Sequence, residues 1–189
     1  MPLSNLPVIR RYLKITIAGS AVAIGLLFAG SGSAALACPS AGLPPSSLSI
    51  EAAETSVTCL VNKARRHHGV RRLRWNASLQ AAAKNHSAAM DSYNFFGHEG
   101  DGSPIERARQ NGYLAGASTW MVGEDLHWGI AGQGTPKATV RRWLSSPVHR
   151  FTMLMPRFRH IGVGVAMGSP VGGQGVNSAI YTADFGLSR

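Results

Sequence analysis

The chain has 189 residues, of which 44% are hydrophobic, and its formal net charge is +10 at pH 7. This length supports one domain with a packed core, and no internal repeat or second domain is visible. The charge favours anionic partners such as acidic wall polymers, lipid headgroups or nucleic acid met non-specifically, although 15 of the 19 basic residues are arginine and a compositional bias explains it equally well. No nucleic-acid-binding motif accompanies the charge, and the export signal described next argues against a specific nucleic-acid partner.

Residues 1–37 are predicted to be a signal peptide. A basic segment precedes an apolar, uncharged run over residues 15–30, and the sequence Ala-Leu-Ala at 35–37 is a small-x-small cleavage motif. The apolar run is short for a membrane span, and an uncleaved anchor is the alternative. An Arg-Arg pair at 10 and 11 is a feature of twin-arginine export signals, but the residues that follow fit that pattern only loosely, so export by the general secretory pathway is favoured. Cleavage would give a secreted or envelope-located chain over residues 38–189 with a charge of +7.

Cys38 and Cys59 are the two cysteines of the chain. An even count in an exported protein indicates a disulfide, which would pin the Pro/Ser-rich tether at residues 38–49 to the first helix and stabilise the fold by roughly 3 kcal/mol. The alternative is that Cys38 is lipidated as the first residue after cleavage, which would leave Cys59 unpaired. Ala35 stands where a lipoprotein signal usually has Leu, which favours the disulfide.

Residues 50–189 are predicted to form the folded domain. Apolar residues at helical spacing predict a first helix from about Ser49 to His68, which Gly69 ends. A strongly basic run closes this helix and continues beyond it: Arg65, Arg66, His67, His68, Arg71, Arg72 and Arg74. This run is interpreted either as a solvated face that complements the helix dipole or as an anion site at Arg71 and Arg72.

Asn76 is predicted to cap a second helix, in which His86 falls on the apolar stripe and is therefore expected to be a hydrogen-bonded core residue rather than a ligand. A capping box at residues 103–106 starts a short third helix, which ends at Asn111-Gly112. Thr135-Pro136 starts a further helix.

Strand patterns come late in the chain. A short strand is predicted over 121–126, a second over 160–166 with one face of small residues for close packing, and a last strand over 178–187 after a Gly-rich turn at 172–175. Helices first and strands late predict an α+β domain with a mainly antiparallel sheet.

The segment from Trp143 to Arg150 closes one helix and restarts another after Pro147. Ser146 is predicted to cap the new helix, and His149 lies in its first turn, where the helix dipole favours the neutral imidazole. Neutral histidine can accept a proton or bind a metal. His149 is expected to meet His98 and Glu124 in one cleft.

An ordered series of motifs accompanies these elements. It consists of Leu60-Val61-Asn62 with Arg65 and Gly69, His86, Phe95-Phe96-Gly97-His98, Asp101-Gly102-Ser103, Arg107, Gly112-Tyr113, Gly123-Glu124, Trp143, Ser146-Pro147-Val148-His149-Arg150, Ile161-Gly162-Val163-Gly164 and Asp184-Phe185-Gly186. The series resembles the CAP superfamily of cysteine-rich secretory proteins, plant pathogenesis-related proteins and insect venom allergens, in its short bacterial form. The resemblance implies a three-layer α-β-α sandwich with a central, mainly antiparallel sheet.

The resemblance also implies a cleft lined by two histidines and two glutamates, in which the histidines of several members hold a divalent metal. His98 and His149 are similar to the histidines and Glu124 to the first glutamate. Ser146 stands where the second glutamate would be, and Asp125 stands where the family usually has Asn.

Three hypotheses about function follow. The first is a binding module that engages lipid, sterol-like or cell-envelope ligands through the His/Glu-lined cleft and a basic face. The second is a metal-dependent, peptidase-like hydrolase that holds a divalent metal such as zinc with His98 and His149, near Glu124. The third makes the cluster a purely structural hydrogen-bond network. The missing glutamate counts against the hydrolase, and the chain offers neither an H-E-x-x-H zinc motif nor, after cleavage, a G-x-S-x-G nucleophile motif.

Overall fold

The computed structural model describes residues 37–172 and 177–189, so the predicted signal peptide up to residue 36 and residues 173–176 of the Gly-rich turn lie outside the described part. The helices are α1 (Ile50–His67), α2 (Ala77–Ser92), α3 (Pro104–Gln110), α4 (Pro136–Ser145) and α5 (Pro147–Leu154), and the strands are β1 (Arg74–Trp75), β2 (Trp120–Ile130), β3 (His160–Ala166) and β4 (Ser178–Ser188). Within the described ranges, no helix is both long and apolar enough to cross a membrane.

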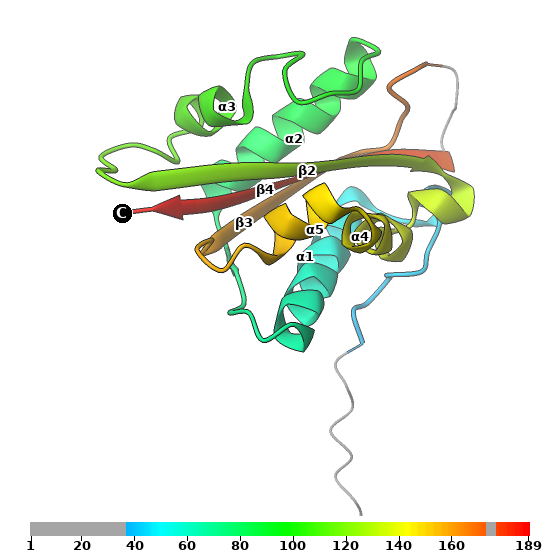
Figure 1. Ribbon diagram of the computed structural model, residues 1–189. Helices are drawn as coiled ribbons and strands as arrows, with labels where there is room; N and C mark the ends of the chain where they lie inside the picture. The colour runs from blue at the N-terminus through cyan, green and yellow to red at the C-terminus, as the bar shows by residue number, and fades with distance from the viewer. Residues whose placement is uncertain (1–36, 173–176) are drawn as a thin grey trace, which may run out of the picture. The chain divides into compact units, whose positions relative to one another are not determined.

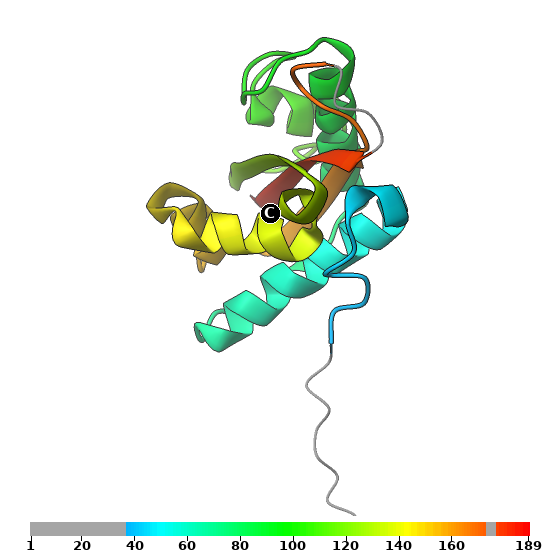
Figure 2. The same ribbon diagram turned by 90° about the vertical axis from the view of Figure 1, so that its right-hand side faces the viewer.

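The strands form one sheet in the order β1-β3-β4-β2. β4 pairs antiparallel with both β2 and β3, and β1 adds a short parallel pairing to β3. Helices α2 and α3 cover one face of this sheet, whereas α1, α4 and α5 cover the other (Figures 1 and 2). The structure confirms the predicted α+β sandwich. The predicted strand over 121–126 is too short, because β2 continues to Ile130 along the full length of β4.

The small residues of β3 allow α2 to lie directly on the sheet, as the sequence predicts. A Cβ atom at Gly162 would lie 2.1 Å from the backbone nitrogen of Gln80, and one at Gly164 would lie 2.2 Å from the backbone of Ala83. Contacts this short are impossible for a side chain, so only glycine permits this approach of helix and strand. The close packing buries the α2 residue His86 completely between the helix and the sheet.

The predicted helix starts are confirmed, and in all but one of them the side chain also makes the capping hydrogen bond. Asn76 accepts a hydrogen bond from the backbone of Leu79, Ser103 and Glu106 form the capping box, and Thr135 accepts from Ala138. Ser146 occupies the predicted N-cap position of α5, but its side chain makes no capping hydrogen bond. The same residue is the C-cap of α4, where its N–H binds the carbonyls of Arg142 and Trp143. Ser146 is therefore the single residue that links α4 to α5.

The interpretation of the basic run as a solvated face is wrong for Arg65. This side chain is fully buried, and its guanidinium donates to the carbonyls of Arg71, Met153 and Met155. Burial lowers its pKa to about 10. Arg65 therefore ties the end of α1 to the segment that follows it and to the end of α5, while its neighbour Arg66 is exposed.

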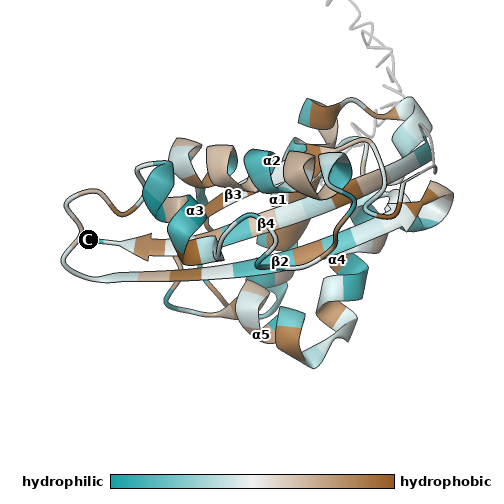
Figure 3. Cartoon of the chain, turned by 90° about the horizontal axis from the view of Figure 1, so that it is seen from above, coloured by the Kyte–Doolittle hydropathy of each residue, from teal (hydrophilic) through white to brown (hydrophobic). Residues whose placement is uncertain are grey.

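The main hydrophobic core lies between the sheet and the layer of α1, α4 and α5. Val57 and Val61 of α1 pack there with Trp143 of α4 and Phe185 of β4. The Trp143 indole donates to the carbonyl of Leu126 at 2.9 Å, which fastens α4 to β2. Hydrophilic residues interrupt the hydrophobic colouring of β2 (Figure 3), and they mark the position of the candidate site.

Candidate functional site

Glu124 lies at the centre of a polar cluster on the edge strand β2. Its register partner on β4 is Asp184, and its side chain is 1% exposed. The Nδ1 of His98 donates to Oε1 at 2.6 Å, and the Nη2 of Arg107 donates to Oε2, also at 2.6 Å. Both carboxylate oxygens are therefore engaged by the protein.

Arg107 organises the loop that carries His98. Besides binding Glu124, this buried arginine of α3 donates to Asp101 at 2.8 Å and to the carbonyl of His98 at 2.9 Å. Asp101 also binds the Nδ1 of His86 at 2.6 Å. This contact confirms His86 as a hydrogen-bonded core residue. The only sequence signal for Arg107 and Asp101 is their place in the ordered motifs, which predicts no role for either.

Contacts and burial set the charges of this cluster. Burial alone would raise the pKa of Glu124, but the hydrogen bond from His98 and the charge of Arg107 outweigh it and hold the pKa below its usual range. The bond from Glu124 correspondingly raises the pKa of His98. Burial lowers the pKa of His86. Glu124 is thus an ionised acid with a half-exposed histidine as its outward partner.

Two further acids are buried near Glu124. Burial and the neighbouring Glu124 charge raise the pKa of Asp184 well above its usual value. The same two causes raise the pKa of Asp125 to about 8. Neither Asp125 oxygen has a hydrogen-bond partner within the described residues. Since neighbouring strand residues point to opposite faces, Asp125 does not join the cluster around Glu124.

His149 lies in the first turn of α5, as predicted, but makes no hydrogen bond to the cluster. Its Nδ1 is buried without a partner among the described residues. Burial, then the charges of His98 and Arg142, lower its pKa. The direction agrees with the sequence prediction, although burial rather than the helix dipole is the leading cause. His149 is therefore a neutral imidazole within electrostatic reach of His98.

The family resemblance implies a divalent metal between the histidines, and the side chains of the site do not fit a catalytic zinc centre. Such a centre needs three protein ligands beside a water. His98 and His149 supply two imidazoles, Glu124 is already bound through both oxygens, and Ser146 replaces the second glutamate. Across residues 37–172 and 177–189, no group of three or more His, Cys, Asp or Glu is placed to hold a metal ion.

The two cysteines form the predicted disulfide. Cys38 and Cys59 are bonded, with their Cα atoms 5.6 Å apart, so the tether is fastened to α1. The structure thereby supports the disulfide over the lipidated alternative for Cys38.

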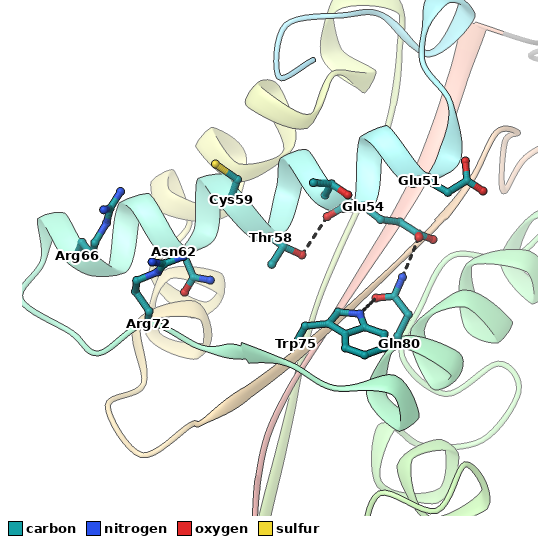
Figure 4. Close-up of a pocket in the computed structure, with 10 residues that line it drawn as sticks. Glu51, Glu54, Thr58, Cys59, Asn62, Arg66, Arg72, Trp75 and Gln80 are labelled. Carbon is teal, nitrogen blue, oxygen red and sulfur yellow. Dashed lines mark hydrogen bonds between the residues drawn. The ribbon is translucent and has the colours of Figure 1, made fainter. Parts of the chain in front are cut away.

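The basic run continues past α1 on the protein surface. Its exposed arginines, called here the basic face, are Arg66, Arg71, Arg72 and Arg74. Arg66 and Arg72 also line a pocket of about 420 Å³ beside α1, together with Trp75 and Gln80 (Figure 4). This pocket has no signal in the sequence, because it depends on the packing of α1 against the start of α2.

Comparisons with known proteins agree with this architecture. An uncharacterized protein of Bacillus subtilis, YkwD, is 35% identical over 118 residues, which is 61% of this chain and 43% of that protein. An extracellular SCP-domain protein from Bacillus anthracis is 24% identical with a TM-score of 0.58, covering 72% of this chain and 40% of that one. An outer surface protein from Borrelia burgdorferi has a TM-score of 0.62 at 17% identity, and the match covers 75% of this chain and 97% of that one.

The two solved structures share the fold with this chain, and the chain spans less than half the length of both Bacillus proteins. The model of the cysteine-rich secretory protein (CAP) family matches residues 59–185, from the disulfide cysteine of α1 to Phe185 of β4. That range contains His98, Glu124 and His149 and most of the described fold. The chain therefore belongs to the cysteine-rich secretory protein family, known as CAP.

Proposed function

We propose that this CAP protein is a binding module outside the cytoplasm that attaches to an anionic polymer of the cell envelope through the basic face. The observation that carries the proposal is the surface at the end of α1, where Arg66, Arg71, Arg72 and Arg74 are all exposed. No acidic residue occurs between positions 55 and 90 to neutralise them. A surface of one sign attracts a polyanion and raises its association rate.

The predicted export signal and the fold agree with a location in the envelope. The signal-like segment over residues 1–37 would deliver the chain across the membrane. The disulfide between Cys38 and Cys59 is of the kind that persists in oxidising compartments. Two proteins that share the fold are described as an extracellular and an outer surface protein.

The polar cluster is better suited to holding the fold than to catalysis. A general base needs an oxygen that is free to take a proton, and both Glu124 oxygens accept hydrogen bonds from His98 and Arg107. The third hypothesis of the sequence analysis, a structural network, therefore describes these residues best. It is compatible with a binding function elsewhere on the surface.

Sedimentation with insoluble bacterial cell wall tests the proposal. Wall is used before and after chemical removal of its phosphate-containing polymer, with the chain over residues 38–189. Arg71→Glu/Arg72→Glu should weaken binding to the untreated wall by on the order of tenfold, and added salt should weaken the wild type. Arg109→Glu/Arg150→Glu, which changes the net charge equally at exposed positions of α3 and α5, is the matched control. Equal loss in both variants, or equal binding to stripped wall, would contradict the proposal.

A metal-dependent hydrolase is the second candidate, and one observation favours it. Burial, followed by the charges of His98 and Arg142, lowers the pKa of His149, so its imidazole is neutral and able to bind a metal. Turnover of a defined peptide or envelope substrate that disappears in Glu124→Ala would support this candidate. Wall binding that survives His149→Ala but weakens in the Arg71/Arg72 variant would support the binding module.

A further inference from the structure

The pocket beside α1 is an elongated groove rather than a compact cavity. Its α1 residues lie on one face of the helix from Glu51 to Arg66 (Figure 4), which is about 22 Å at the rise of an α-helix. A volume of about 420 Å³ spread over that length is shallow. Such a groove fits a chain-like ligand better than a small compact metabolite.

Trp75 gives this groove an aromatic wall. Its side chain belongs to the edge strand β1 and is 62% exposed. The indole N–H donates to the Oε1 of Gln80 at 3.3 Å, and the same oxygen accepts from the backbone N–H of Val163 at 2.9 Å. The exposed ring is thus held in place by the sheet. An aromatic face carries a negative quadrupole that attracts the polarised C–H bonds of a sugar ring.

A buried acid holds the glutamine that orients the tryptophan. Gln80 donates to the Oε2 of Glu54 at 2.7 Å, while the Oε1 of Glu54 has no hydrogen-bond partner within the described residues. The Glu54 side chain is 8% exposed, and Lys84 lies 3.6 Å from its Oε1. The Glu54 carboxylate is thus buried and engaged by Gln80 and Lys84, and it fixes the amide that holds the Trp75 indole.

The far end of the groove has the opposite character. Arg66 and Arg72 line it, away from Glu54 and Trp75 (Figure 4). Guanidinium groups bind carboxylates and phosphates through paired N–H donors. One ligand that satisfies an aromatic wall and two guanidinium groups in a row is a glycan whose sugar rings carry acidic substituents.

We propose that this groove binds a short stretch of acidic glycan, with one sugar ring stacked on Trp75 and an acidic substituent paired with Arg66 and Arg72. The inference deepens the proposed function, on which it rests, because such a glycan is a segment of an anionic envelope polymer. The groove would then make the specific contacts with the polymer, while Arg71 and Arg74, the remaining residues of the basic face, would attract it over longer distances.

The Trp75 indole N–H signal in ¹H–¹⁵N NMR spectra is a local probe, and Trp75→Phe assigns it among the four tryptophans. The titrants are a carboxylated tetrasaccharide of alternating N-acetylglucosamine and N-acetylmuramic acid, the neutral tetramer of N-acetylglucosamine, and hexaglutamate. The acidic tetrasaccharide should shift the Trp75 signal to saturation, the neutral one should bind on the order of tenfold more weakly, and hexaglutamate should leave it unmoved. Failure of both sugars to move the signal, or an equal response to the peptide, would overturn the proposal.

Variants separate the groove from the basic face. Trp75→Ala should abolish tetrasaccharide binding and Trp75→Phe should retain part of it, while Trp120→Ala, at an exposed tryptophan of β2, should have no effect. Arg66→Ala/Arg72→Ala should remove the preference for the acidic sugar. If Trp75→Ala binds the tetrasaccharide normally, the groove proposal fails while wall binding through the basic face stands. If the wild type does not sediment with wall, the proposed function fails, and the titration still decides whether the groove takes the sugar.

Discussion

The imidazole of His98 and the carboxylate of Glu124 are joined by a hydrogen bond of 2.6 Å between Nδ1 and Oε1. One partner is half exposed and the other is 1% exposed. The bond therefore links a surface loop to the centre of β2. Because Arg107 holds the second oxygen, the acid stays ionised in a buried position.

This asymmetry predicts unequal losses of stability. Glu124→Gln should cost about 3 kcal/mol of unfolding free energy, because it leaves the buried Arg107 without its full counter-charge. His98→Ala should cost only about 1 kcal/mol, because its side chain is largely solvated and the Arg107 contact remains. Urea unfolding at pH 7 measures both, with the exposed neighbour Glu99→Ala as control. Equal losses at the two positions would contradict the central role of Arg107.

Asp125 should make stability depend on pH. Its pKa is raised to about 8 from a usual value of 3.8, so folding favours the protonated form. That contribution is complete below about pH 4 and is lost as the pH rises toward 8. Asp125→Asn should therefore stabilise the fold by on the order of 2 kcal/mol at pH 8.5, or roughly 4–8 °C in Tm, and by much less at pH 5. Thermal melts at both values check this, and an equal gain at each pH would show that burial of the charge is not the cause.

The contact between β3 and α2 should tolerate no side chain. Gly162→Ala and Gly164→Ala would place a methyl group within 2.2 Å of the α2 backbone, so each should cost about 3 kcal/mol or prevent folding. Gly132→Ala, where a Cβ would meet nothing within 4 Å, is the matched control. Circular dichroism during urea unfolding gives the free energies. Near-wild-type stability of Gly162→Ala would show that α2 does not lie this close to β3.

Zinc should bind weakly at His98 and His149, because the site offers two imidazoles and no third protein ligand. Calorimetric titration of zinc into the chain over residues 38–189 should show no micromolar site that the His98→Ala/His149→Ala variant lacks. Micromolar binding lost in that variant would establish a metal site and shift the balance toward the hydrolase.

Local signals in the sequence predicted most of the fold. The alternation of Gly162 and Gly164 with larger residues located the packing face of β3, and the Asn76 and Ser103 motifs located two helix starts. Ser146 occupies its predicted capping position, but it is also the C-cap of the preceding helix and its side chain makes no capping hydrogen bond, which no pattern of one helix reveals.

Only those residues of the site that belong to the family's motifs could be assigned a role from the sequence. His98 and Glu124 meet as the family resemblance implied, but the partner that fixes them, Arg107, gave no local signal. Arg65 looked like a surface charge within a basic run, and only the distant carbonyls of Met153 and Met155 make its burial favourable. The groove at Trp75 likewise arises from tertiary packing.

The most direct test of binding without cleavage is one incubation of the chain over residues 38–189 with insoluble cell wall, followed by separation of pellet and supernatant. We predict protein in the pellet and no increase in soluble reducing ends or free amines over a protein-free sample, with Arg71→Glu/Arg72→Glu remaining in the supernatant. Release of soluble fragments by the wild type, and none by His149→Ala, would contradict the account and make this CAP protein an enzyme.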